Sequence, residues 1–105
     1  MYTIVESAIF ARKARAFLSE ESLEALAEYL ALNPNAAVVI PGSGGLRKLR
    51  WGSRFGGKRG GYRVIYFNRL QRGQVLLVVI YSKRRHDNFT NDELIQFKKA
   101  LEDDD

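Results

Sequence analysis

Basic side chains in the middle of the sequence carry its clearest chemistry. Between Tyr29 and His86 the chain has twelve lysines and arginines and no acidic residue. Such a local excess of positive charge destabilises a fold unless an anion or an acidic partner meets it. Aromatic residues are interspersed with these cations, a mixture typical of surfaces that bind single-stranded nucleic acids. They are Trp51, Phe55, Tyr62, Tyr66, Phe67 and Tyr81. The sequence therefore predicts contact with nucleic acid.

Clustered lysines and arginines can cleave RNA without a metal, because the substrate brings its own nucleophile in the 2′-hydroxyl. The protein then supplies a base for that hydroxyl, cations for the dianionic phosphorane and an acid for the 5′-oxygen leaving group. Arginine stays charged and binds phosphate through two N–H groups. A lysine crowded by other cations has its pKa lowered, which makes it a better base.

The positions of five residues suit these catalytic roles. Arg63 lies in an otherwise apolar and aromatic strand, where a buried guanidinium would be costly, so we expect it to face an open surface. The only histidine is the one side chain that titrates near neutrality and could donate a proton, although an ordinary exposed loop histidine is the alternative. The candidate catalytic residues are Lys58, Arg63, Lys83, Arg84 and His86.

Further residues of the same region are expected to bind the RNA strand. Their side chains would pair with phosphates or stack on bases. These candidates are Arg47, Lys48, Arg50, Arg59 and Tyr66.

Two other chemistries fit the sequence less well. Residues 52–58 match the start of a phosphate-binding P-loop, but Arg59 stands where magnesium binding needs Ser or Thr, and a strand follows in place of a helix. A metal site would have to rely on His86, Asp87 and Asp92, whose spacing is a weak signal. We therefore expect neither a metal nor any other cofactor.

Composition limits the remaining choices. A chain of 105 residues is expected to form a single domain over 1–105. The absence of cysteine excludes disulfides, thiolate zinc sites and cysteine nucleophiles, and it fits a reducing compartment. No stretch approaches the ~18 apolar residues of a membrane span. We expect a cytoplasmic protein without membrane contact.

Hydrophobic periodicity indicates strands and helices that would position these residues. Strands are expected at 2–6, 46–51, 62–68 and 75–81, the last covered on both sides, while 38–40 is a short apolar run that ends at Pro41. A helix is expected at 8–18 with Ser7 as its N-cap, and a second helix is expected from its N-cap Ser19 to Asn33, where Pro34 stops it. A third helix is expected after Thr90, which begins a capping box with Glu93. Residues 102–105 read as a frayed acidic tail. This order predicts an α+β fold with an antiparallel sheet of about four strands and helices on one face.

Three segments, GLRKLRW at 45–51, GKRGGYRVIY at 57–66 and LLVVIYSK at 76–83, resemble the RelE/ParE toxin superfamily of bacterial type II toxin-antitoxin systems. The resemblance is strongest to its HigB branch and extends over nearly the whole chain. It implies a RelE-like fold and a ribosome-dependent endoribonuclease that cuts mRNA and stops translation. It also implies a cognate antitoxin, usually with a helix-turn-helix DNA-binding domain, through which alone the toxin would meet operator DNA.

The resemblance also implies roles for single residues. Arg63 matches a phosphate-stabilising arginine, and Lys58 corresponds roughly to a loop residue that helps activate the 2′-hydroxyl. Lys83 and Arg84 match a basic pair at the end of a strand. A tyrosine or histidine often follows that strand in the family, and His86 occupies this region here together with Phe89.

Two alternatives stay open from the sequence. The same fold carries ParE-type gyrase poisons, and a plain RNA or ribosome binder would need no turnover. The basic residues on the Arg63 strand, and Lys83 and Arg84 after the next strand, favour cleavage over gyrase inhibition, which needs a protein-binding surface.

Overall fold

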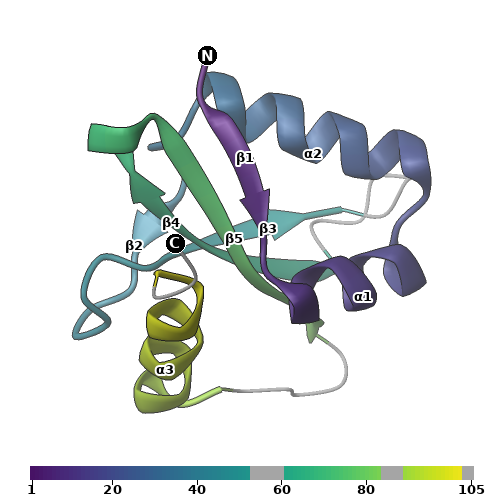
Figure 1. Cartoon of the computed structure of the whole chain (residues 1–105). Coiled ribbons are helices and arrows are strands. Elements are labelled where there is room, and N and C mark those ends of the chain that lie inside the picture. The colour runs from purple at the N-terminus through teal and green to yellow at the C-terminus, as the bar shows by residue number, and fades with distance from the viewer. Residues whose placement is uncertain (53–60, 84–88, 103–105) are drawn as a thin grey trace.

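The computed structural model describes residues 1–52, 61–83 and 89–102. These residues form three α-helices, one 3₁₀ turn and a five-stranded sheet (Figure 1). In chain order the elements are β1 (Thr3–Glu6), α1 (Ala8–Phe17), α2 (Glu20–Leu32), β2 (Val38–Val39), β3 (Arg47–Trp51), β4 (Tyr62–Arg69), the 3₁₀ turn η1 (Leu70–Arg72), β5 (Gln74–Ser82) and α3 (Asn91–Glu102).

The sheet is mixed. Its strand order is β1-β5-β4-β3-β2, with β1 parallel to β5 and every other pair antiparallel. The α+β class is thus confirmed, with one strand more than expected. The expectation of a purely antiparallel sheet is wrong. After α1 and α2 the chain enters the sheet at β2, the edge farthest from β1, and the antiparallel strands β2 to β5 then bring it back beside β1 in the same direction.

Helices α1 and α2 cover one face of the sheet. Their inner side chains, among them Phe10 and Leu30, share a buried cluster with Val64 and Ile80 of the central strands. Ser7 Oγ accepts a hydrogen bond from the Phe10 N–H at 3.0 Å, and the same hydroxyl donates to the Val78 carbonyl of β5 at 2.6 Å. The predicted N-cap of α1 is confirmed, and it also ties the helix to the sheet.

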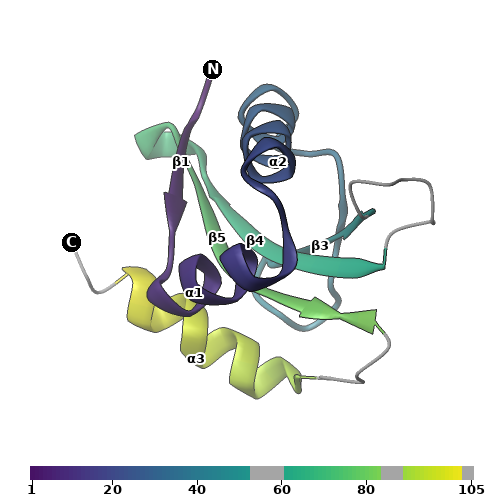
Figure 2. The same ribbon diagram turned by 90° about the vertical axis from the view of Figure 1, so that its right-hand side faces the viewer.

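Helix α3 covers the other face, so the expectation of helices on one face only is wrong (Figure 2). Leu94 of α3 is buried against Ile65 and Val79. The predicted capping box is confirmed, since the Glu93 N–H donates to Thr90 Oγ1 at 3.1 Å and the Thr90 N–H donates to Glu93 Oε1 at 2.8 Å. Both faces of the sheet carry apolar side chains, so a helix is needed on each face to bury them.

Strand β5 lies between these layers, and its residues from Val75 to Tyr81 are all buried. Its predicted coverage on both sides is confirmed. In the described part of the chain no helix has the length and apolarity to cross a bilayer. Glu102 is the last residue of α3, and the rest of the predicted acidic tail, 103–105, lies outside the described residues.

Candidate functional site

Basic residues meet at the end of the sheet where β3 ends and β4 begins. Arg63 of β4 pairs in register with Arg50 of β3 on one side and with Tyr81 of β5 on the other. Residues directly opposite one another in antiparallel strands point to the same face of the sheet. Arg50, Arg63 and Tyr81 therefore form a row across three strands.

This row lies on the face that α3 partly covers, because Tyr81 shares a buried cluster with Ile65 and Leu94. Lys48 is opposite Ile65 in the strand register and belongs to the same face. Lys83 follows directly after β5, and its backbone N–H donates to the Gly61 carbonyl at 3.0 Å, which places it beside the start of β4. We call Lys48, Arg50, Arg63 and Lys83 the basic surface.

Electrostatics favour an anion at the basic surface. Arg50 and Arg63 are like charges in directly opposed positions, an arrangement that destabilises a strand pair. Arg50, Lys48 and Lys83 are exposed, while Arg63 is half-buried, with its Nη1 donating to the Tyr62 carbonyl at 3.2 Å. A phosphodiester bound over Arg50 and Arg63 would relieve their repulsion.

Tyr81 is a member of this row that the sequence-based list of site residues omitted. It is 8% exposed. Burial raises the pKa of its hydroxyl above the ordinary value of 10.0, and the positive charge of Arg63 partly offsets that rise. The hydroxyl is thus protonated at neutral pH and close to the guanidinium. Tyr81 is two residues before Lys83, and residues with this spacing on an extended chain point to the same face. This spacing could have identified Tyr81 from the sequence.

Aromatic side chains extend from Tyr81 toward the helices. Phe89 packs edge-on against Tyr81, with ring centroids 5.7 Å apart, and against Phe97 at 5.5 Å. The Nζ of Lys13 on α1 lies 5.8 Å from the centroid of Phe89. Lys13 brings another cation to this side of Tyr81, and no sequence pattern links it to residues so far along the chain.

Tyr66 does not belong to the basic surface. Its side chain is fully buried beneath α2, where its hydroxyl donates to the Pro34 carbonyl at 2.8 Å and accepts from the Ala37 N–H at 3.2 Å. Burial raises its pKa, while the Ala37 hydrogen bond and the charge of Arg47 act against that rise. The expected contact of Tyr66 with RNA is therefore wrong, because strand alternation turns this residue into the core.

Arg47 is also separated from the row of Arg63. It is opposite Tyr66 in register, and its Nη1 donates to the Ala37 carbonyl at 2.5 Å. It thus lies on the face of β3 that carries α2, unlike Lys48 and Arg50. The structure brings together Lys48, Arg50, Arg63 and Lys83 from the predicted set, and it leaves Arg47 elsewhere.

Four predicted residues, Lys58, Arg59, Arg84 and His86, lie outside the described residues. In chain order these segments follow β3 and β5, the strands that carry Arg50 and Tyr81. Among the residues that the structure does describe, no three His, Asp or Glu side chains gather as a metal site would require.

Comparison with solved structures supports the fold assignment. Escherichia coli RelE with two arginine-to-alanine substitutions, in the free state, matches with a TM-score of 0.62 and 14% identity, over 90% of this chain and 95% of that chain. The isolated E. coli RelE toxin in a P21 crystal form matches with a TM-score of 0.61 and 16% identity, over 98% of both chains. At these identities the likeness is one of fold.

A family model provides the stronger finding. The model described as "RelE toxin of RelE / RelB toxin-antitoxin system" matches residues 3–103, nearly the whole chain. The resemblance inferred from the three sequence segments is thereby confirmed, while its HigB branch stays a prediction. The chain belongs to the RelE toxin family and is a toxin of the toxin-antitoxin class, with an antitoxin as its implied partner.

Proposed function

We propose that this toxin is a ribosome-dependent endoribonuclease that cleaves mRNA and so inhibits translation. The cleavage needs no metal, because the 2′-hydroxyl of the RNA attacks the adjacent phosphate. The cognate antitoxin, a helix-turn-helix DNA-binding protein, would silence the toxin and connect it to operator DNA.

One observation carries this proposal: Arg50 and Arg63 are directly opposed on the same face of the sheet, beside Lys83 and the buried hydroxyl of Tyr81. Like charges in directly opposed positions destabilise a strand pair, and an anion bound over both offsets that cost. A phosphodiester gains negative charge in its transition state, and fixed cations stabilise that charge.

The reaction assigns a task to each of these groups. The 2′-oxygen forms a bond to phosphorus and loses its proton to a base, while the bond from phosphorus to the 5′-oxygen breaks and that oxygen takes up a proton. The products are a 2′,3′-cyclic phosphate and a 5′-hydroxyl end. Arg63 and Lys83 bind the phosphorane oxygens, and Tyr81 holds the Arg63 guanidinium in place.

Residues beyond the described ranges complete the proposal. Lys58 is our candidate for the base that activates the 2′-hydroxyl, and Arg84 and His86 are candidates for phosphate contact and for proton donation to the leaving group. Lys48, Arg50 and Arg59 would contact the phosphates of the neighbouring nucleotides. Such contacts fix the position of the strand without selecting its sequence.

The experiment that tests the proposal compares wild type with Arg63→Ala on ribosomes programmed with a defined mRNA. New 5′ ends are mapped, and the circular dichroism spectrum reports folding. We expect the variant to cleave on the order of 10² to 10³-fold more slowly, the loss typical when one stabilising donor is removed. Arg12→Ala is the matched control, since it removes one exposed arginine of α1 and leaves the basic surface intact.

Three outcomes would contradict the proposal. Equal cleavage by a folded Arg63→Ala variant would remove its central residue. Ribosomes that stall without new RNA ends would indicate a binder without turnover. DNA double-strand breaks in cells whose translation continues would indicate a gyrase poison.

A further inference from the structure

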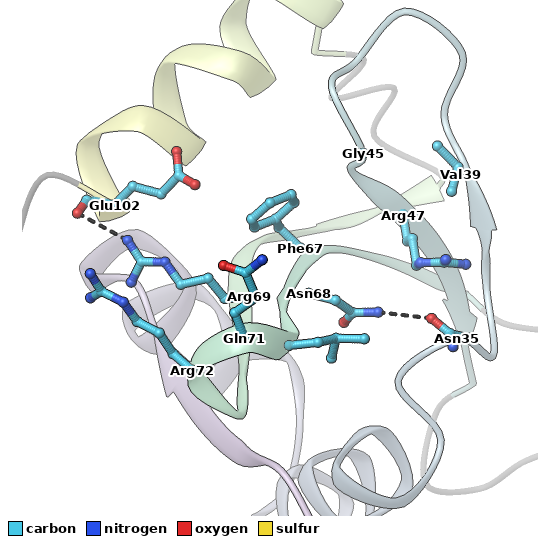
Figure 3. A pocket seen from close by; sticks show the side chains of 11 residues that line it. Asn35, Val39, Gly45, Arg47, Phe67, Asn68, Arg69, Gln71, Arg72 and Glu102 are labelled. Atoms are coloured by element: carbon cyan, nitrogen blue, oxygen red, sulfur yellow. Dashed lines mark hydrogen bonds between the residues drawn. The ribbon is translucent and has the colours of Figure 1, made fainter.

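A hollow of about 540 Å³ lies at the opposite end of β4 from Arg63. Its walls come from the end of β4, the turn η1, the last turn of α3, the start of β3 and the edge strand β2 (Figure 3). Arg63 and Arg69 are six residues apart on β4, which corresponds to about 20 Å at ~3.3 Å per residue. The hollow is therefore separate from the basic surface, and its volume is typical of a site for one small molecule.

Positive side chains outnumber negative ones in this hollow. Three arginines, Arg47, Arg69 and Arg72, line it against one carboxylate, that of Glu102. Arg69 is held in position because its Nη2 donates to the backbone carbonyl of Glu102 at 3.2 Å. Arg47 is held by its bond to the Ala37 carbonyl. Fixed guanidinium groups of this kind bind an anion through charge-assisted hydrogen bonds.

The balance of charge favours a terminal phosphate as that anion. Three arginines and one glutamate leave an excess of two positive charges in the hollow. A phosphate monoester carries about −1.5 to −2 charge at neutral pH and balances this excess. A phosphodiester inside an RNA strand carries a single negative charge, as a carboxylate does. The Nζ of Lys98, which lies 4.0 Å from the centroid of Phe67, strengthens the positive potential further.

A flat apolar surface lies among these cations. Figure 3 shows the ring of Phe67 between Arg69 on one side and Arg47 on the other. Gly45 backs this ring closely, since a Cβ at that position would lie 3.2 Å from Phe67 Cε1, and its φ of +100° also favours glycine. Leu70 on η1 lines the same hollow and is 41% exposed. A planar ring such as a nucleobase suits this surface, because every base has an apolar face that packs on aromatic side chains.

Carboxamide groups on the walls can hydrogen-bond to the edge of such a ring. Gln71 on η1 and Asn35 before β2 both line the hollow and are exposed. Asn35 Oδ1 accepts from Asn68 Nδ2 at 3.2 Å. The carboxamide of Gln71 makes no hydrogen bond within the part of the chain that the structure describes. A carboxamide presents both donors and an acceptor, which matches the mixed pattern on the edge of a base.

We propose that the hollow binds a free nucleoside monophosphate. Its phosphate binds to Arg69 and Arg72. Its base packs against Phe67 and Leu70, and the edge of the base meets the Gln71 carboxamide. Phosphate, ring face and ring edge thus each find a matching group on the walls. This site does not depend on the proposed RNA cleavage, which takes place at the basic surface.

Isothermal titration calorimetry with adenosine 5′-monophosphate (AMP) on the full-length toxin tests the proposal. We expect saturable binding that Arg72→Glu weakens by about tenfold or more, because a charge-assisted hydrogen bond is replaced by repulsion. Arg12→Glu is the matched control, since it makes the same change of charge on α1. It should leave the affinity within about twofold, because salt screens distant exposed charges.

Two fragments of the probe separate its parts. Adenosine lacks the phosphate and inorganic phosphate lacks the base, so each should bind at least about tenfold more weakly than AMP. Inorganic phosphate that binds as tightly as AMP would overturn the proposal by showing a plain anion site. Equal weakening by Arg72→Glu and Arg12→Glu would overturn it by showing non-specific charge attraction, and so would a wild-type toxin that does not bind AMP.

Nuclear magnetic resonance locates the bound AMP independently of any variant. Backbone amide shifts are expected to change at Arg69, Gln71 and Arg72, and to stay unchanged at Arg50 and Arg63. Shifts confined to the basic surface would overturn the proposal. Displacement of AMP from the hollow by a 5′-phosphorylated pentauridine of higher affinity would also overturn it and would identify a site for the end of an RNA strand.

Cleavage assays keep this proposal distinct from the ribonuclease activity. Arg72→Glu should cleave mRNA on programmed ribosomes at the wild-type rate, since the basic surface is about 20 Å away. Arg63→Ala should bind AMP as the wild type does. A loss of cleavage in Arg72→Glu equal to that in Arg63→Ala would show that the hollow belongs to the cleavage site and would overturn a separate nucleotide site.

Discussion

Arg63 and Tyr81 occupy directly opposed positions on β4 and β5, on the face of the sheet that α3 covers. The guanidinium at this position lies close enough to the buried tyrosine hydroxyl to influence its pKa. The ring of Tyr81 is in turn fixed by Phe89. A half-buried arginine with such a neighbour is restricted in its orientation, which is what a group that must meet a phosphorane needs.

Tyr81→Phe is expected to lower kcat about tenfold while KM for programmed ribosomes stays near the wild-type value. The substitution removes the hydroxyl beside Arg63 and keeps the ring that packs on Phe89. Single-turnover cleavage and a KM determination measure the two effects. A wild-type kcat would show that the hydroxyl does not position Arg63, and a change confined to the melting temperature would indicate a structural role only.

Arg50→Ala and Arg47→Ala are expected to differ although the residues are three apart on one strand. Arg50 lies on the basic surface, so its loss should weaken RNA binding and lower the slope of log K against log salt by about one. Arg47 is tied to Ala37 on the other face, so its loss should mainly lower the free energy of unfolding. Salt titrations and urea unfolding of both variants separate the effects. The assignment of faces would be contradicted by equal salt slopes.

Tyr66 should make the toxin less stable at high pH. Burial raises its pKa above 10.0 in the folded state, so the native protein holds this proton when the unfolded chain has lost it. The resulting stabilisation is complete below pH 10 and is lost as pH rises through the folded-state value. Tyr66→Phe removes this dependence, and it costs about 1 to 3 kcal/mol at neutral pH because the buried Ala37 N–H loses its acceptor.

Urea unfolding between pH 8 and pH 11 measures the effect of Tyr66. The free energy of unfolding of the wild type should fall more steeply above pH 10 than that of Tyr66→Phe. Parallel curves would show that another group, for which Tyr81 is the candidate, carries the alkaline dependence.

Much of the fold was predictable because its signals are local. Ser7, Ser19 and Thr90 cap the helices that they were expected to cap, and Asn33 ends α2. The apolar residues of β5 correctly indicated a strand buried on both faces. The position of α3 on the second face of the sheet was not predicted. The pattern of apolar residues in a helix shows which side of the helix is buried, but it does not show which face of the sheet that side packs against.

The composition of the basic region did not predict which of its aromatic residues lie on the surface. Trp51, Tyr62 and Tyr66 were grouped with the basic residues as a surface for stacking bases. In the structure Trp51 Nε1 donates to Ser22 Oγ at 3.1 Å, Tyr62 stacks on Phe17 with centroids 5.0 Å apart, and Tyr66 lies in the core. Only the registers of β3, β4 and β5 reveal which side chains share a face, and those registers depend on long-range pairing.

Cleavage of an mRNA with a single 2′-deoxynucleotide tests the central claim most directly. The modified nucleotide replaces the one 5′ of the scissile phosphate on programmed ribosomes, and the unmodified mRNA is the control. If the basic surface stabilises attack by the 2′-hydroxyl, the wild-type toxin will cut the control to a 2′,3′-cyclic phosphate and leave the modified linkage intact. Cleavage of the modified linkage at the control rate would contradict the account.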